Sequence, residues 1–484
     1  IINPRDATDK IVPILELDFG EVLNKLSLVD DPYEPLKKQV SPEVVEKLRA
    51  LEIQGIVFAR ESYRAYPEKN MGGHILGFMG SDKKGNKSGK YGLEGYFDAD
   101  IRGKEGYLKS ERNPLGSWIM FGDNDIEQAV NGSDLVLTID RSIQFTACEK
   151  LQQAVKDFDA DGGTVIVMNP WSGAVLAMCS LPDFDPNNYS EVENISIYNN
   201  PAIFDLYEAG SVMKPITMAA ALDVGEVTPE STYKDEGFIK FHEHTIKNSD
   251  GEKYGIQTMT NVLENSLNTG VVYVVDKLGK KKFREYLENF GFSAKTGIEL
   301  DTEVGGNISS LWKRGEIYAA TASFGQGISV TPLELVSAFG AIANGGKLMK
   351  PYIVDEIRKD NGFIAKTESK EIRQVISEKT ARLLGGMLVS VVDNGHGRRA
   401  GVSGYFVAGK TGTAQVAKQE GGGYEEDISI GSFVGFAPVN DPKFVMLVKI
   451  NNPKAVEWAE NSAAPVFGQI AEFLLNYFKV PTER

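Results

Sequence analysis

The sequence predicts an α+β (α/β) fold, with a central five-stranded antiparallel sheet flanked by helices and a smaller mixed domain at the N-terminus. A β-hairpin comes early in the main domain, with strands at residues 163–168 and 174–180. Three further strand-like segments come late, at residues 405–413, 431–437 and 444–450. Helical segments lie between the two groups. One antiparallel sheet would therefore be assembled from both ends of the domain.

Residues 1–140 are predicted to form the smaller domain, and residues 141–484 the main one. Within the first, residues 41–52 begin with Ser-Pro-Glu. A serine cap, a proline in the first turn and an early carboxylate are typical of a helix start. Glycines are dense over residues 71–106, which predicts strands and tight turns.

A strand at 135–139 and a helix at 142–158 flank the predicted domain boundary. The turn of the hairpin falls at 169–173, a run of Asn, Pro, Trp, Ser and Gly. Between two of the late strands, residues 419–427 form a loop rich in glycine and acidic residues, which we expect to be mobile. An amphipathic helix at 465–478 closes the chain.

The composition is that of an ordinary globular protein, with 42% apolar and 25% charged residues. The 67 acidic residues outnumber the 52 basic ones, for a net charge of −15, which argues against nucleic acid as the main partner. No run of residues reaches the roughly 18 to 20 apolar positions that a membrane-spanning helix needs. The chain also starts without Met or a signal peptide. Either the protein is soluble, or an anchor precedes the given sequence.

The two cysteines and four histidines give no metal-ligand pattern. Cys148 and Cys179 form no Cys-x-x-Cys motif. One disulfide is possible, but buried free thiols are the favoured interpretation, because both lie in apolar-periodic stretches. Residues 242–244, His-Glu-His, lie in a polar loop that is typical of solvated surface. We assign no metal and no cofactor. No histidine has an acidic partner of the triad kind, which favours lysine as a catalytic base.

Ser211 and Lys214 stand three residues apart at the start of an apolar helical segment. Pro215 is tolerated only in a first helical turn, so the helix should begin very close to Ser211. Residues three apart share a helix face. A serine hydroxyl needs a neighbouring base, and a lysine can be that base where burial or other cations depress its pKa. The N–H groups of a helix start also favour developing negative charge. The pattern predicts a serine acyl-transfer site.

The same Ser-x-x-Lys spacing occurs three more times, so chance supplies it readily. Two of these lie in polar stretches, and the third lies beside Trp312 and Arg314 without a helix-start signal. None of them opens an apolar helix. They are Ser81/Lys84, Ser231/Lys234 and Ser310/Lys313.

Ser266, Leu267 and Asn268 precede a second apolar stretch. A serine hydroxyl can relay a proton, and an asparagine amide can hold a lysine or a substrate carbonyl. The alternative is a capped helix junction, which is common for Ser/Asn/Thr clusters. For this motif alone, the capped junction is the favoured interpretation.

Lys410, Thr411, Gly412 and Thr413 fall on a predicted strand. The two threonines would share one face and bind a carboxylate, while the glycine would let another chain approach and the lysine would add positive charge. An ordinary Thr-rich strand is the favoured alternative for this motif alone. A second Lys-Thr-Gly, at 295–297, lacks the fourth threonine and lies in a Gly-rich connection, so we reject it as the site.

In this order, the three motifs resemble those of the class B penicillin-binding proteins, the monofunctional D,D-transpeptidases that cross-link peptidoglycan. The resemblance covers nearly the whole chain. It implies a penicillin-binding/β-lactamase-like transpeptidase domain on a non-catalytic pedestal that is truncated at its N-terminus. The flanking stretches that match are 64–67, 92–96, 137–140, 169–174, 182–187, 324–328 and 331–333.

The resemblance implies a role for each residue of the first two motifs. Ser211 would be acylated by a stem peptide ending in D-Ala-D-Ala, or by a β-lactam. Lys214 would accept the serine proton. Ser266 and Asn268 would support proton relay and substrate positioning.

The third motif would bind substrate, again as the resemblance implies. Lys410, Thr411 and Thr413 would hold the substrate carboxylate, with Gly412 between them. The backbone N–H groups of Ser211 and Thr413 would form the oxyanion hole. Such a donor is worth roughly 100- to 1000-fold in rate.

Family members normally begin with a cytoplasmic tail, a membrane-spanning helix and the first part of the pedestal, none of which is evident here. The resemblance implies a location at the outer face of the cytoplasmic membrane. It also implies a membrane glycosyltransferase of the division or elongation machinery as a partner. The short pedestal and the Gly-Leu-Glu-Gly-Tyr stretch at 92–96 favour the division-type branch.

Two other activities fit parts of the sequence. One is hydrolysis, by a D,D-carboxypeptidase or a β-lactamase. The large N-terminal region and the lack of an evident deacylating Glu motif argue against a β-lactamase. The other is a non-enzymatic scaffold or β-lactam sensor, against which the three intact motifs argue.

Overall fold

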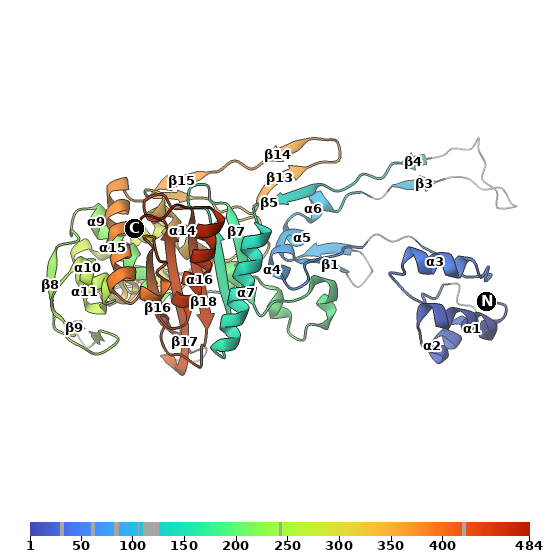
Figure 1. Cartoon of the computed structure of the whole chain (residues 1–484), viewed down its shortest axis with the longest axis horizontal. Coiled ribbons are helices and arrows are strands. Elements are labelled where there is room, and N and C mark those ends of the chain that lie inside the picture. Colours follow the sequence, from blue (N-terminus) through green and yellow to red (C-terminus); the bar gives the residue numbers. More distant parts are fainter. Residues whose placement is uncertain are drawn as a thin grey trace. The chain divides into compact units, whose positions relative to one another are not determined.

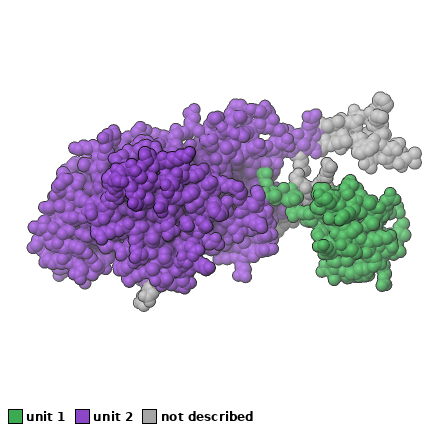
Figure 2. All heavy atoms as spheres, viewed as in Figure 1, with its two compact units in different colours: residues 1–65 green, residues 66–484 purple. Residues whose placement is uncertain are grey.

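The structure divides into two compact units, Ile1–Ala65 and Tyr66–Arg484, which Figure 2 draws in different colours. Lys84, His242, Glu243 and the predicted loop residues 419–422 lie outside the described residues. The predicted domain boundary near residue 140 stays a prediction. This computed structural model describes residues 1–29, 33–59, 63–81, 87–104, 106–109, 125–241, 244–418 and 423–484.

The first unit contains a small helical cluster. Its helices are α1 (Pro4–Leu15), α2 (Phe19–Leu26) and α3 (Pro42–Arg49). The predicted helix start is confirmed, because Ser41 is the N-cap of α3 and its hydroxyl accepts a hydrogen bond from Val44 N at 3.4 Å. A core of four buried residues holds the helices together: Ala7, Ile11, Leu15 and Leu48.

The start of the second unit is more helical than the sequence predicted. The expectation of strands and tight turns holds for β1 and β2, but it is wrong for the glycine-rich stretch at 92–96, which forms helix α5. A Cβ atom added to Gly92 would lie only 2.4 Å from the carbonyl oxygen of Ile75, so this glycine permits close packing of two short helices. The elements are α4 (Gly73–Leu76), β1 (Phe78–Ser81), β2 (Lys87–Lys90), α5 (Gly92–Tyr96), α6 (Asp98–Ile101), β3 (Tyr107–Lys109), β4 (Asp125–Glu127) and β5 (Asp134–Leu137).

A five-stranded antiparallel sheet forms the centre of the second unit (Figure 1). Two early strands and three late ones pair as predicted, with β18 beside β6. Strand β16 begins and ends later than predicted and lies at one edge of the sheet. Strand β17 begins already at Tyr424, so the loop predicted at residues 419–427 is wrong for residues 424–427. In sheet order the strands are β16 (Ala408–Ala417), β17 (Tyr424–Ala437), β18 (Phe444–Asn451), β6 (Gly162–Met168) and β7 (Val175–Leu181).

Alternate strand residues contribute to two different cores. Val165 and Val167 of β6 pack in one core with α7 (Arg141–Asp157) and α16 (Ala463–Tyr477). Ile166 and Met168 pack in the other, which includes the wholly buried helix α14 (Pro332–Ala343). Since side chains alternate across a strand, both faces of this sheet are buried.

Further helices and small sheets complete the described part of the second unit. No helix in the described residues is both long enough and apolar enough to cross a bilayer. The helices are α8 (Pro201–Phe204), α9 (Lys214–Asp223), α10 (Met259–Glu264), α11 (Asn268–Leu278), α12 (Lys280–Asn289), α13 (Ile317–Ala322) and α15 (Glu378–Asn394). The strands are β8 (Thr232–Asp235), β9 (Phe238–Phe241), β10 (His244–Lys247), β11 (Gly255–Thr258), β12 (Lys347–Met349), β13 (Val354–Arg358), β14 (Ile364–Lys366) and β15 (Glu371–Gln374).

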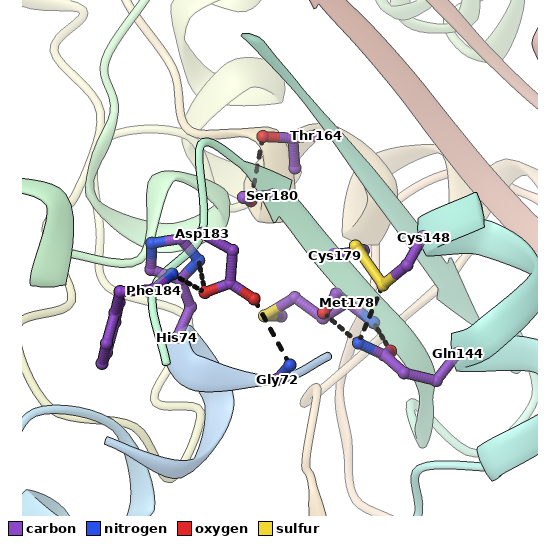
Figure 3. Close-up of a disulfide and its surroundings, with 10 residues drawn as sticks. All are labelled: Gly72, His74, Gln144, Cys148, Thr164, Met178, Cys179, Ser180, Asp183 and Phe184. Carbon is purple, nitrogen blue, oxygen red and sulfur yellow. Dashed lines mark hydrogen bonds and ion pairs between the residues drawn. A yellow bond between two sulfur atoms is a disulfide. The ribbon is translucent and has the colours of Figure 1, made fainter. Parts of the chain in front are cut away.

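The prediction of free cysteines is wrong. Cys148 on α7 and Cys179 on β7 form a disulfide, with their Cα atoms 5.5 Å apart (Figure 3). The helix is held against the strand by Gln144, whose amide donates to Met178 O at 2.9 Å and accepts from Met178 N at 2.8 Å. This packing brings together two cysteines that are 31 positions apart.

A buried contact between His74 and Asp183 joins α4 to the segment after β7 (Figure 3). His74 Nδ1 lies 3.3 Å from a carboxylate oxygen of Asp183, and both side chains are buried. The other carboxylate oxygen accepts from Gly72 N at 3.4 Å, at the start of α4. Burial raises the pKa of Asp183, against the lowering effects of His74 and of the backbone N–H groups.

Candidate active site

Ser211 lies at the start of a helix, as predicted. It belongs to a 3₁₀ turn, η3 (Gly210–Met213), which runs directly into α9. Pro215 falls in the first turn of α9, where its missing N–H costs no hydrogen bond. Residues 214–222 are all buried, so the helix is fixed in the core while Ser211 remains half-buried at its start.

Edge strand β16 packs its backbone against the Ser211 segment. A Cβ atom added to Gly412 would lie 2.9 Å from Ala209 O and 3.0 Å from Val212 N. A Cβ atom added to Gly210 would lie 3.1 Å from Thr413 O. The close approach expected at Gly412 is therefore present, and the two glycines let the first and third motifs touch.

Lys214 is fully buried, at 0% exposure. Its Nζ donates to Ser266 Oγ at 3.1 Å and to the carbonyl oxygen of Ser266. Burial lowers its pKa well below the usual value, the nearby charge of Lys410 lowers it further, and Asp250 opposes them. A neutral amine has two N–H groups and one lone pair. The two contacts with Ser266 use both N–H groups, so the lone pair remains to accept a proton.

The second motif lies between α10 and α11 and contacts the first through Ser266. Ser266 has a φ of +55°, a left-handed conformation that turns the chain sharply. Leu267 is the N-cap of α11 and makes no side-chain capping bond, so the capped-junction alternative does not describe this turn. The amide of Asn268 donates to Lys247 O at 2.9 Å, which joins α11 to the end of β10.

Lys410 is also fully buried. Its Nζ donates to the carbonyl oxygen of Thr411 at 3.0 Å and to the hydroxyl oxygen of the same residue at 3.2 Å. Burial lowers its pKa to about 7, against the raising effect of Glu460. At neutral pH the Lys410 side chain therefore gains or loses its proton easily, depending on whether an anion lies beside it.

Among the described residues, the hydroxyl groups of Thr411 and Thr413 accept hydrogen bonds and donate none. Thr411 accepts from Lys410, and Thr413 Oγ1 accepts from Ala459 N at 3.0 Å. A hydroxyl that accepts one hydrogen bond still has its own hydrogen. Two hydroxyl donors and one ammonium group on an edge strand can hold a carboxylate.

A buried carboxylate that the sequence did not signal supports the second motif. Asp235 is 0% exposed. One of its oxygens accepts from Thr269 Oγ1 at 2.6 Å, and the other accepts from Asn248 Nδ2 at 3.1 Å. Since Thr269 follows Asn268 directly, Asp235 fixes the start of α11. Asp235 stands among polar residues in the sequence, so no local pattern marks it as buried.

Two family models match this chain. Residues 163–472 match the family model of the penicillin binding protein transpeptidase domain, and residues 3–137 match that of the penicillin-binding protein dimerisation domain. The chain is 36% identical to stage V sporulation protein D of Bacillus subtilis over 479 residues, which cover 97% of this chain and 72% of that protein. It is 29% identical to the peptidoglycan D,D-transpeptidase FtsI homolog of Mesostigma viride over 505 residues, 98% of this chain and 83% of that one.

Solved structures are similar across most of the chain. Penicillin binding protein 3 from Mycobacterium tuberculosis, in its apo form, has a TM-score of 0.76 and 29% sequence identity, covering 87% of this chain and 92% of that one. The transpeptidase model alone spans more than half of the sequence, and the dimerisation model accounts for the region before it. This chain therefore belongs to the class B penicillin-binding proteins, a family of peptidoglycan D,D-transpeptidases.

Proposed function

We propose that the protein cross-links peptidoglycan through a covalent ester on Ser211. The Ser211 oxygen attacks the carbonyl carbon between the two D-alanines of a stem peptide, and the terminal D-Ala leaves. The amine of a second stem peptide then takes the acyl group and frees Ser211. The same hydroxyl attacks the carbonyl of a β-lactam, whose ring opens and which stays attached to Ser211 as an ester. The observation that carries this proposal is the fully buried Lys214 amine, whose hydrogen bonds to described residues go to two neutral oxygens of Ser266.

Lys214 is the proposed base for Ser211. The two residues start one helix and stand three positions apart. Because burial lowers the pKa of Lys214, its lone pair can take the hydroxyl proton as the serine attacks. Ser266, bonded to the same amine, can pass this proton to the leaving group. Asn268, fixed beside it by Lys247 and the Asp235 network, is the proposed positioning group for the substrate backbone.

Strand β16 is the proposed binding surface for the peptide. An edge strand has unpaired backbone groups, to which an extended peptide can add as a further strand. Lys410, Thr411 and Thr413 would hold the terminal carboxylate. The backbone N–H groups of Ser211 and Thr413 would stabilise the negative oxygen of the tetrahedral intermediate. Gly412 supports this arrangement, since it allows the strand to reach the serine segment.

The proposed cellular context follows the family. The enzyme would act at the outer face of the cytoplasmic membrane, held by an anchor outside the given chain, with residues 1–140 as pedestal and 141–484 as catalytic domain. A membrane glycosyltransferase would supply the glycan strands. The proposal includes the division-type role that the sequence predicted.

Labelling with a fluorescent penicillin tests the proposal. Ser211→Ala should abolish labelling completely without lowering the melting temperature by more than a few degrees. Peptide mapping of the wild-type adduct by mass spectrometry should place the added mass on the peptide that contains residue 211. Ser310→Ala, which removes the serine of another Ser-x-x-Lys, should label normally. Labelling that survives in Ser211→Ala would rule out this nucleophile.

Turnover of a stem peptide separates the alternative activities. A transpeptidase yields a cross-linked dimer when an acceptor amine is present, whereas a carboxypeptidase yields only the shortened peptide. A β-lactamase would clear the penicillin adduct quickly, and a sensor would form the adduct without processing stem peptide. We expect the dimer together with a long-lived adduct.

A further inference from the structure

Glu208 lies three residues before Ser211, and the proposed mechanism gives it no role. Its half-buried carboxylate accepts two hydrogen bonds, from Gly327 N at 2.9 Å and from the hydroxyl of Tyr424 at 2.9 Å. The two donors belong to different segments: a turn that follows α13, and the beginning of β17. One carboxylate thus connects the serine segment to two other parts of the fold.

Both of these segments bear directly on the site. β17 pairs with β16 along its length, with Gly431 opposite Thr413, so a tether at the start of β17 fixes the hairpin that carries the third motif. In the turn, a Cβ atom added to Gly325 would lie 2.3 Å from Gly210 O, and Gly210 N donates to Gly325 O at 3.4 Å. The turn therefore packs on the residue that immediately precedes Ser211.

The residues before Glu208 are anchored separately. Tyr207 exchanges two backbone hydrogen bonds with Val330, at 3.2 and 3.0 Å, and its hydroxyl lies 3.3 Å from Ser432 Oγ. The buried Lys449 ammonium lies 4.9 Å from the centre of the Tyr207 ring and 3.6 Å from Asp205. These contacts attach the chain to the sheet up to residue 207. Glu208 is the next attachment along the chain toward the nucleophile.

The charge of Glu208 is not neutralised by an ion pair with any described residue. Burial raises its pKa, against the two hydrogen bonds that it accepts. Taking a carboxylate partly out of water without a cation costs free energy, so general stabilisation does not explain the presence of Glu208. The two directed hydrogen bonds that it accepts do explain it.

We propose that Glu208 is a positioning residue that sets the place of Ser211 relative to β16 through Gly327 and Tyr424. It contacts no reacting atom itself. The inference rests on the proposed role of Ser211 as nucleophile. Glu208→Gln can keep both links, because the amide oxygen accepts from Gly327 N–H and the amide nitrogen donates to the Tyr424 oxygen. Glu208→Ala removes both links.

The test separates positioning from binding by measuring the dissociation constant of the initial penicillin complex and the rate constant of acylation. In Glu208→Ala we expect acylation to slow by about 10- to 100-fold, as for a misplacement on the order of 1 Å, with the dissociation constant changed by less than about threefold. Glu208→Gln should restore acylation to within about threefold of wild type, and Tyr424→Phe should lose about 2- to 10-fold. Wild-type acylation in Glu208→Ala would overturn the inference.

Glu303 offers a matched control outside the three motifs. Its buried carboxylate accepts three hydrogen bonds, from Thr296 N, Thr296 Oγ1 and Gly297 N. Glu303→Ala should lower the melting temperature and leave the acylation rate unchanged. Equal slowing in this control would make the Glu208 effect one of general destabilisation and overturn the inference.

The outcomes also separate this inference from the proposed function. If Ser211→Ala abolishes labelling while Glu208→Ala acylates normally, only the inference fails. If Ser211→Ala still labels, the proposed function fails, and the inference that rests on it fails with it. Should Glu208→Ala not fold, Tyr424→Phe decides, because a wild-type acylation rate in that variant would contradict a positioning link through Tyr424.

Discussion

Two regions of the molecule carry the same short sequence patterns and differ in what surrounds them. The candidate active site contains Lys214 and Lys410, and residues 295–313 contain Lys295 and Lys313 in matching motifs. Both active-site lysines are fully buried, whereas the other two are exposed. A lysine becomes a proton acceptor only where burial or neighbouring cations lower its pKa. The two regions thus share the sequence pattern, and we expect proton transfer by lysine only in the region where the lysines are buried.

The glycines and hydroxyls of the two regions differ in the same way. In the second Lys-Thr-Gly, Thr296 and Gly297 are bound to Glu303, so the motif builds a local turn. In the candidate active site, Gly412 packs against the serine segment instead. Ser310, the serine of the second Ser-x-x-Lys, has a buried hydroxyl without a hydrogen-bond partner among the described residues. Ser211, Lys214, Lys410 and Gly412 therefore each have a counterpart outside the site for comparison.

The largest difference should come from the two Ser-x-x-Lys lysines. Lys214→Ala removes the proposed base and should slow penicillin acylation by about 1000-fold or more, within the range for general-base loss. Lys313→Ala removes an exposed ammonium that lies 5.6 Å from the ring centre of Tyr318, and should change the rate by less than twofold. Stopped-flow acylation measures both. Similar losses in the two variants would mean that the comparison assigns the wrong lysine.

The two Lys-Thr-Gly lysines should differ next. Lys410→Ala removes a cation from the proposed carboxylate site and from the surroundings of Lys214, and should lower the second-order acylation constant by about 100-fold. Lys295→Ala should leave it unchanged. A β-lactam analogue without its carboxylate sharpens the test, because it should lose much of the difference between wild type and Lys410→Ala.

The two glycines should separate activity from stability. In Gly412→Ala the new methyl group meets backbone at 2.9 and 3.0 Å, so strand and serine segment must move apart, and we expect acylation to fall by about 10- to 100-fold. Gly297 has a φ of +78°, and a Cβ atom added there would lie 3.4 Å from Cε of Lys350, the end of a flexible side chain. Gly297→Ala should therefore cost about 1 kcal/mol of unfolding free energy and no activity. Thermal unfolding and acylation rates, measured on both variants, give the comparison.

The smallest expected effect is a pH dependence of stability. Since the pKa of Lys410 is lowered to about 7 in the folded chain, the unfolded chain binds more protons between this value and its own higher pKa. The contribution of Lys410 to the unfolding free energy is therefore unfavourable below pH 7 and improves by about 1 kcal/mol per pH unit above it. Lys410→Met should remove this slope, and Lys295→Met should keep it. Urea unfolding at pH 7 and pH 9 tests the difference, and equal slopes in all three proteins would contradict it.

Local patterns predicted several elements correctly because their causes are local. Ser41 caps its helix with its own hydroxyl, and Pro215 restricts the helix start beside Ser211. The strands predicted at residues 163–168 and 444–450 are present as β6 and β18. Glycine was a poorer guide. At residue 92 it serves close packing between helices, which depends on a partner segment that the local sequence does not reveal.

Other features depended on segments far apart in the chain. Cys148 and Cys179 meet only because α7 packs across β7. Asp235 and Glu208 resemble ordinary surface acids in the sequence, yet each joins separate parts of the site.

By itself, the sequence determined the order of the motifs, many of the element types and the chemical groups available for acyl transfer. Only the tertiary structure decided which of several lysines loses contact with water, which glycine touches the serine segment and which acids join the segments of the site. The reason is physical: a side chain brings its functional group, but the desolvation that lowers a lysine pKa comes from neighbours contributed by the whole fold.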